Sequence, residues 1–313
     1  MILAPRCRAW LALALSAITF AVAFASQAAA PVKADVPLEY IADIEAWHDK
    51  MENSLRRDNG WLTLAGRFVM KPGANAFGTG KDNDIVFPAE LRGTGPGRLG
   101  TITVEPGKVT LKLADGVSMS SEGKPFSGER ILQPAGDKRD WVSLGRISMH
   151  IIERDGTYVL RLADNESAVR KNFAGRLWYD PDPRFVVNAK FVPYPPGKKI
   201  SIVNVIDEVS DEPCPGYVEF KLMGKSYRMD VVGEDEGLFF VFRDATAGIT
   251  TYRPSRFLYV DVRPAPNTTF KLDFNKAYNP PCAFSEFTTC PLPPKQNIIG
   301  SKIEAGEKYR KKS

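Results

Sequence analysis

Histidine is scarce in this 313-residue sequence, which contains only His48 and His150. Its four cysteines show no C-x-x-C spacing, and no G-x-S-x-G segment occurs. Zinc sites are built from closely spaced cysteines and histidines, and the nucleophile elbow of the α/β-hydrolases requires that serine motif. These absences argue against a zinc centre and against that class of hydrolase. We therefore expect neither a metal ion nor another cofactor.

A strong charge of one sign is also missing. The formal net charge is +5, and it falls to +3 when residues 1–30 are set aside, because 42 basic residues become 40 against 37 acidic ones. This excess is too small to favour a nucleic-acid partner. Beyond residue 30 no apolar run is long enough to cross a bilayer, so we expect no integral membrane segment in the mature chain.

The N-terminus has the pattern of a bacterial secretory signal. Two arginines precede an uncharged apolar run over residues 10–25, and Ala28 and Ala30 fit the −3 and −1 positions of an A-x-A cleavage site. An uncleaved membrane anchor is the alternative, but the run is short for a span. We expect a signal peptide over residues 1–30, cleavage near Ala30, and a periplasmic or secreted mature protein.

Apolar periodicity predicts one helix followed by many strands. Apolar residues recur every three or four positions over residues 38–57, which indicates an amphipathic helix. From Trp61 onward the period changes to two, which is typical of strands. Three hairpins are predicted, over residues 101–113, 147–162 and 217–231, and Pro106-Gly107 and Asp155-Gly156 supply turn chemistry for the first two.

These patterns predict a mainly β protein with an antiparallel β-sandwich or barrel-like core and an N-terminal helix. The proline-rich stretch at residues 181–185 is the best candidate for a seam between two modules. We predict an N-terminal β module over residues 58–180 and a C-terminal β module over residues 181–307. Residues 308–313 form a basic tail.

Two cysteines lie in a proline-rich loop near the C-terminus. Alternation over residues 270–275 predicts a strand, and Pro280 and Pro281 then bar both helix and sheet. Cys282 and Cys290 are eight positions apart, and in an oxidising compartment we expect them to form a disulfide that holds the shape of the loop. A thiol pair for redox or metal chemistry is the alternative. Cys214 is then left as a single buried thiol.

The stretch LDFNKAYNPPCAFSEFTTCPLPPKQN, followed by IEAGEK, closely resembles the signature of the DUF1684 family, a bacterial and archaeal family of unknown function. The resemblance extends to FRDATAGITTYRPSRFL, NFAGRLWYDPDPRFVVNAKF and GWLTLAGRFVMKPGANAFGTGKDNDIVFP, and covers roughly residues 38–307. It implies no particular activity. The positions that match the polar motifs of the family are Asp244, Thr246, Tyr252, Arg256, Asp273, Asn275, Tyr278, Asn279, Cys282, Cys290, Glu304 and Glu307.

Three functions follow from these features. The first is a binding or structural module of the cell envelope, in which tyrosines and tryptophans hold a glycan, a peptide or another envelope component. The second is an exported hydrolase in which Asp244 and Asp273 act as general acid and base, with Arg256 or Tyr252 holding the substrate. The third is thiol redox chemistry of Cys282 and Cys290. We favour the first, since the two aspartates can equally satisfy amides at turns and strand ends. Further binding candidates are Thr246, Asn275, Tyr278 and Asn279.

Overall fold

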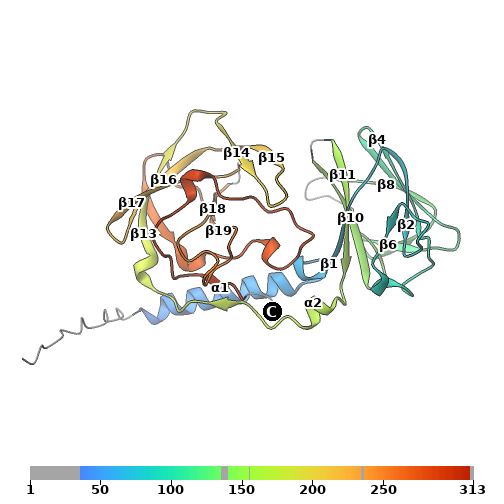
Figure 1. Cartoon of the computed structure of the whole chain (residues 1–313), viewed down its shortest axis with the longest axis horizontal. Coiled ribbons are helices and arrows are strands. Elements are labelled where there is room, and N and C mark those ends of the chain that lie inside the picture. The colour runs from blue at the N-terminus through green and yellow to red at the C-terminus, as the bar shows by residue number, and fades with distance from the viewer. Residues whose placement is uncertain (1–35, 135–139, 155, 234–235, 311–313) are drawn as a thin grey trace, which may run out of the picture. The chain divides into compact units, whose positions relative to one another are not determined.

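In the computed structural model, the chain is described over residues 36–134, 140–154, 156–233 and 236–310 (Figure 1). The predicted signal peptide, residues 1–30, lies outside these ranges. The described part begins with helix α1, Leu38–Arg56, which buries Ile44 and Leu55. The predicted amphipathic helix is therefore confirmed. The chain turns immediately afterwards at Asn59, whose φ of 57° lies in the left-handed region that asparagine tolerates better than most residues.

The strands that follow form two antiparallel sheets joined by one hydrophobic core. The six-stranded sheet has the order β1–β11–β10–β9–β6–β7, and the five-stranded sheet has the order β3–β2–β4–β5–β8, in which the short pair β2–β3 is parallel. Buried residues of both sheets, such as Phe77, Leu111 and Leu160, belong to a single apolar cluster. The bounds are β1 Leu64–Val69, β2 Gly73–Gly78, β3 Ile85–Val86, β4 Gly100–Glu105, β5 Lys108–Leu113, β6 Met119–Ser121, β7 Lys124–Phe126, β8 Glu129–Leu132, β9 Val142–Leu144, β10 Ile147–Arg154 and β11 Thr157–Asp164.

A second set of strands surrounds another apolar core. One sheet has the order β17–β16–β13–β20, and the remaining strands pair as β18–β19, β14–β15 and β12–β21. Buried side chains from these strands, such as Phe191, Phe220 and Phe240, pack together. The bounds are β12 Leu177–Trp178, β13 Val186–Pro193, β14 Lys199–Val203, β15 Val209–Pro213, β16 Gly216–Leu222, β17 Lys225–Asp230, β18 Leu238–Phe242, β19 Arg256–Val260, β20 Thr269–Asp273 and β21 Glu307–Lys308.

Short helical turns connect these strands. Apart from α1, the one α-helix in the described ranges is the single turn α2, Ala168–Lys171. The 3₁₀ turns are η1 Trp61–Thr63, η2 Ala89–Leu91, η3 Pro183–Phe185, η4 Phe274–Lys276, η5 Pro281–Ala283 and η6 Lys295–Asn297.

All three predicted hairpins are present as antiparallel pairs. They are β4 with β5, β10 with β11, and β16 with β17. Gly107 has a φ of 71°, which fits the third position of the predicted type II turn. In the last hairpin the turn lies at Met223 and Gly224, both with positive φ, as a type I′ turn requires.

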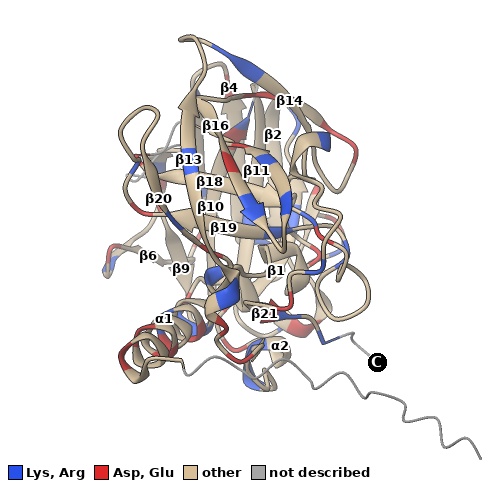
Figure 2. Ribbon diagram, turned by 90° about the vertical axis from the view of Figure 1, so that its left-hand side faces the viewer, with Lys and Arg blue, Asp and Glu red and all other residues tan. Residues whose placement is uncertain are grey.

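The mainly β, antiparallel fold with an N-terminal helix is thus confirmed, and no sheet in the described ranges closes on itself. The seam at residues 181–185 stays a prediction; the first apolar cluster ends at Leu162 and the second begins with Phe185, at the end of this stretch. Acidic and basic residues lie interspersed over the strands and along α1 (Figure 2). In the described residues, no helix is long and apolar enough to cross a membrane.

Candidate functional site

The ends of strands β18 and β19 hold a buried ion pair, Asp244 with Arg256. The Arg256 side chain is 1% exposed, and its Nη2 donates to Asp244 Oδ1 at 3.0 Å and to the carbonyl oxygen of Ile303 at 3.0 Å. Its Nη1 donates to the carbonyl oxygen of Ala305 at 2.5 Å. Burial lowers the pKa of Arg256, although Asp244 opposes that effect. The pair therefore fixes the segment around residues 303–305 against the core.

The Asp244 carboxylate is fully engaged by donors besides Arg256. It accepts from the backbone N–H of Thr246 at 3.1 Å and of Ile303 at 2.6 Å. The Thr246 hydroxyl lies within 3.0 Å of both carboxylate oxygens and 2.8 Å from the hydroxyl of Thr251. These contacts, together with the burial of its side chain, give Asp244 a structural role and leave its carboxylate inaccessible to a substrate.

Asp273 and Asn275 form a second, separate network at the end of β20. Asp273 Oδ1 accepts from the backbone N–H and the side-chain amide of Asn275, both at 2.9 Å. Its Oδ2 accepts from the hydroxyl of Tyr40 on α1 at 2.9 Å. Burial, and then the charge of Asp273, raise the pKa of Tyr40, so its hydroxyl stays a donor. Asn275 accepts a hydrogen bond from the backbone N–H of Asp182 and donates one to its carbonyl oxygen. This network therefore connects α1, η4 and the loop around residue 182.

Glu307 and Arg176 form a third network, in which Arg176 was not among the predicted residues. Arg176 Nη1 donates to Glu307 Oε2 at 2.5 Å, and the side chains are 4% and 2% exposed. The same oxygen accepts from the backbone N–H of Asn279 at 2.7 Å. Burial raises the pKa of Glu307 to about 7, against the lowering effect of Arg176. The guanidinium group of Arg176 also lies over the rings of Phe284 and Trp178, at 4.8 and 5.9 Å from their centroids.

A cavity of about 350 Å³ lies between α1 and strands β19 and β20. It brings together Asp273 and Tyr278 of the predicted site residues, whereas Asp244, Arg256 and Tyr252 do not line it. Asp244 and Asp273 share no hydrogen-bond partner in the described part of the chain. The full lining is Trp47, Lys50, Met51, Leu258, Tyr259, Val260, Asp261, Lys271, Asp273, Lys276 and Tyr278.

The cavity combines aromatic rings with lysines. Trp47 and Tyr278 pack edge to face with ring centroids 6.3 Å apart. None of Lys50, Lys271 and Lys276 forms an ion pair within the described ranges. No local pattern in the sequence indicates that Trp47 and Lys50 of the helix lie beside strands more than 200 positions away.

Tyr252 and Asn279 lie outside this cavity. The Tyr252 ring packs against Tyr309 with centroids 4.9 Å apart, and burial raises its pKa. Asn279 donates through Nδ2 to the carbonyl oxygen of Lys308 at 2.9 Å. The backbone N–H of Tyr309 donates to the carbonyl oxygen of Thr250 at 2.9 Å. Residues 308–309, at the start of the predicted basic tail, are therefore hydrogen-bonded to the body of the protein.

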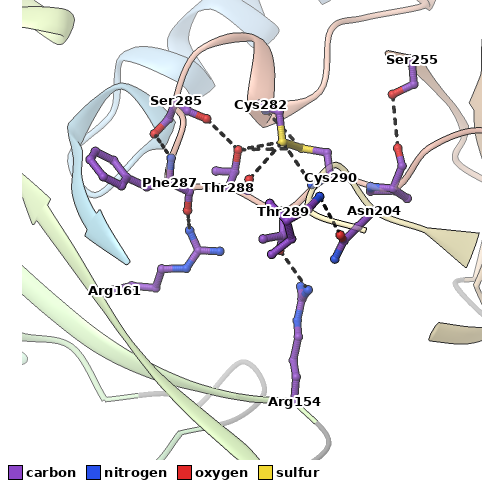
Figure 3. The surroundings of a disulfide bond; sticks show 12 residues. Arg154, Arg161, Asn204, Ser255, Cys282, Ser285, Phe287, Thr288, Thr289 and Cys290 are labelled. Carbon is purple, nitrogen blue, oxygen red and sulfur yellow. Dashed lines mark hydrogen bonds between the residues drawn. A yellow bond between two sulfur atoms is a disulfide. The ribbon is translucent and has the colours of Figure 1, made fainter. Parts of the chain in front are cut away.

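Cys282 and Cys290 are joined by the predicted disulfide, with their Cα atoms 6.1 Å apart (Figure 3). Cys282 Sγ accepts hydrogen bonds from the backbone N–H of Cys290 at 3.1 Å and from the Thr288 hydroxyl at 3.0 Å. Such a bond stabilises a small loop by about 2–4 kcal/mol, mainly by restricting the unfolded chain. Cys214 is free and buried, as predicted, and burial raises its pKa to about 11.

The two histidines are packed against aromatic rings. His48 stacks on Trp178 with centroids 3.9 Å apart, and burial lowers its pKa to about 4. His150 lies on Trp141 at 4.0 Å. Among the described residues, no group of three or more histidines, cysteines or carboxylates is arranged to hold a metal ion.

Comparison with known proteins identifies one family. The model described as "Protein of unknown function (DUF1684)" matches residues 171–308, a shorter range than the resemblance in the sequence suggests. A solution NMR structure of an uncharacterized protein from Haloarcula marismortui is 31% identical, and the match covers 44% of this chain and 78% of that chain with a TM-score of 0.38. No curated protein matches this chain.

We expect Arg256→Met to lower the free energy of unfolding by about 3–5 kcal/mol, because it leaves Asp244 buried without its charge partner. The double variant Asp244→Asn, Arg256→Met should lose less than the sum of the two single changes. Urea denaturation followed by circular dichroism measures both. Arg184→Met, which removes an exposed partner of Asp182, serves as the control and should cost under about 1 kcal/mol. A cost that small for Arg256→Met would refute the structural role of the pair.

Glu307 should make stability depend on pH. Its pKa rises from 4.5 in the unfolded chain to about 7 in the folded protein, so between these values the folded state binds a proton that the unfolded state has released. The contribution of Glu307 to the free energy of unfolding is therefore complete below pH 4.5 and declines as the pH rises to about 7. Above that pH it no longer changes. Relative to Glu307→Gln, the native protein should lose stability across that window in urea titrations at a series of pH values. Glu304→Gln, an exposed neighbour, should leave the pH dependence unchanged. Parallel curves for native protein and Glu307→Gln would contradict the prediction.

Proposed function

The chain belongs to the DUF1684 family of proteins of unknown function, and we propose that it acts as an exported binding module of the cell envelope. Its ligand on this proposal is an acidic glycan, held in the cavity between α1 and strands β19 and β20. The observation that carries the proposal is the lining of that cavity, in which aromatic rings stand beside three lysines that form no ion pair with any residue the structure describes.

The aromatic part of the lining suits the faces of sugar rings. Trp47 and Tyr278 are half-buried, so part of each ring is exposed, and Met51 adds a soft apolar surface beside them. Tyrosine and tryptophan rings offer a large apolar surface together with a polar edge, which fits a ligand that has both kinds of surface. A cavity of about 350 Å³ accommodates one or two sugar units.

The charged part of the lining favours a ligand with carboxylate groups. Three ammonium groups, those of Lys50, Lys271 and Lys276, stand against the carboxylates of Asp261 and Asp273. The donors of Tyr40 and Asn275 that contact Asp273 are neutral and do not cancel its charge, so the lining sets three lysine charges against two carboxylates, an excess of one positive charge. A uronic acid residue of an acidic glycan supplies the missing negative charge.

The contacts of Asp244 and Asp273 favour binding of a glycan over its hydrolysis. A glycosidase-type mechanism needs two carboxyl groups that flank one bond, with one of them free to donate a proton. Asp244 lies in the buried ion pair with Arg256 and does not reach the cavity, and Asp273 accepts three hydrogen bonds. The disulfide of Cys282 and Cys290 is likewise packed among hydrogen-bond donors, which suits a structural bond.

Binding should weaken when the lysines lose their charge. We expect the double variant Lys271→Gln, Lys276→Gln to bind tetragalacturonate roughly tenfold more weakly than the native protein, because two exposed charge contacts are worth about 0.5–1 kcal/mol each. Isothermal titration calorimetry measures the affinity, and higher salt should weaken it further. Neutral cellotetraose should bind more weakly than the acidic oligosaccharide.

The matched control is Lys295→Gln, Lys302→Gln, which removes two lysines that do not line the cavity. It should retain native affinity. Trp47→Ala should lose affinity without any change in the salt dependence, since it removes a ring and no charge. Failure of native protein to bind any acidic oligosaccharide, or equal losses in the two lysine pairs, would refute the ligand assignment.

Export is tested independently of the ligand. We expect cell fractionation to recover the protein in the periplasm or the medium, with an intact mass that lacks residues 1–30. Replacing the apolar run by charged residues should keep the protein in the cytoplasm at full length. Recovery of the full-length native chain from the cytoplasm would refute export.

A further inference from the structure

Two arginines lie directly opposite each other on neighbouring strands of the six-stranded sheet. Arg67 of β1 is the register partner of Arg161 of β11, so the two side chains emerge on the same face. That face is turned away from the apolar core, which takes the alternate residues Leu160 and Leu162. Like charges placed opposite each other in a sheet are destabilising, so such a pair needs compensation by an anion.

A third arginine joins them from the next strand. Arg154 is the last residue of β10. Its side chain and that of Arg161 reach the loop between Cys282 and Cys290 from the same side (Figure 3). Arg154 donates to the hydroxyl of Thr289 at 3.3 Å, and Arg161 donates to the carbonyl oxygen of Phe287. Both acceptors are neutral, so neither contact balances a positive charge.

The described residues supply little negative charge to this cluster. Within the described ranges, the one carboxylate paired with any of the three arginines is Glu208, whose Oε1 lies 3.9 Å from Arg67 Nη2. That glutamate side chain is 57% exposed, where an ion pair contributes little. In addition, Arg67 Nε is buried and has no hydrogen-bond partner within the described part of the chain. Arg161 is itself 7% exposed, and burying a charge without a counter-charge is costly.

Arg161 lies close enough to Arg67 and to Arg154 to feel the charge of each. Burial, and then the charges of Arg67 and Arg154, lower the pKa of Arg161 to about 10. Arg161 nevertheless remains protonated at neutral pH. Among the described residues, the cluster therefore pairs three positive charges with one exposed carboxylate.

We propose that Arg67, Arg154 and Arg161 form a binding site for a phosphate group beside the disulfide loop. Guanidinium groups match the oxygens of phosphate with paired N–H donors, and several of them around one anion give a strong, specific site. Free phosphate and the phosphate ester of a sugar present the same oxygens. The site shares no residue with the cavity between α1 and β19, so it does not depend on the acidic-glycan proposal.

The disulfide helps to hold this site in place. Phe287 and Thr289, which orient Arg161 and Arg154, lie inside the loop that Cys282 and Cys290 close. Cys282→Ser, Cys290→Ser frees that loop, so it should weaken phosphate binding while leaving the three arginines unchanged. A merely electrostatic attraction to the surface would not respond to this change.

Titration calorimetry at constant ionic strength, maintained with chloride, tests the proposal with inorganic phosphate and with glucose 6-phosphate. We expect saturable binding that becomes at least roughly tenfold weaker in Arg67→Gln, Arg154→Gln. Binding of both compounds indicates a site for the free anion, and binding of the sugar phosphate alone indicates a site for an ester; either supports the proposal. These two arginines are used because Arg161 is buried and its loss can disturb folding.

Arg92→Gln is the matched control, since Arg92 is exposed in the turn that follows η2 and forms no ion pair in the described residues. It should bind phosphate as tightly as the native protein, as should Lys271→Gln, Lys276→Gln. The proposal is overturned if neither compound binds beyond the effect of chloride. It is also overturned if the arginine variants retain native affinity, or if the lysine variant loses it.

Discussion

The buried ion pair between Asp244 and Arg256 is the interaction on which the C-terminal half of this protein depends. Arg256 also donates to the carbonyl oxygens of Ile303 and Ala305, and Asp244 accepts a hydrogen bond from the backbone N–H of Ile303. The last described segment is thereby fixed against β18 and β19. Two residues further on, Glu307 pairs with Arg176 and receives the N–H of Asn279, next to Tyr278 in the cavity wall. A charge interaction in the core thus determines where the cavity can form.

Helix α1 completes the cavity because three kinds of contact hold it there. Tyr40 donates to Asp273, Trp47 packs on Tyr278 and Trp178, and Glu52 accepts from the backbone N–H of Arg176. The helix buries few residues of its own, so these contacts with the C-terminal strands do most to place it. Its position brings Lys50 next to Lys271 and Lys276, a set of charges that local sequence does not show.

Local patterns in the sequence predicted the helix, the three hairpins, the disulfide and the burial of Cys214. Each depends on residues close together in the chain: apolar spacing, turn residues, or two cysteines eight positions apart. The candidate site was predicted less well. Asp244, Arg256 and Asp273 were correctly recognised as polar residues in or next to the C-terminal strands, but the fold places Asp244 and Arg256 together in one network and Asp273 in another. Arg176, Trp47 and the lysines were missed, because their roles arise from contacts across more than 100 positions of sequence.

The hydrogen bond from Tyr40 to Asp273 spans 233 positions of the chain. A ribosome or a translocation channel delivers the N-terminus first, so α1 emerges long before the strands that receive it. A 19-residue helix without a partner is only marginally stable in water. The docking of α1 therefore belongs to the end of folding, after nearly the whole polypeptide has been released, and such long-range closure is intrinsically slow. A fragment limited to residues 171–308, the range the family model matches, lacks α1 and with it one wall of the cavity.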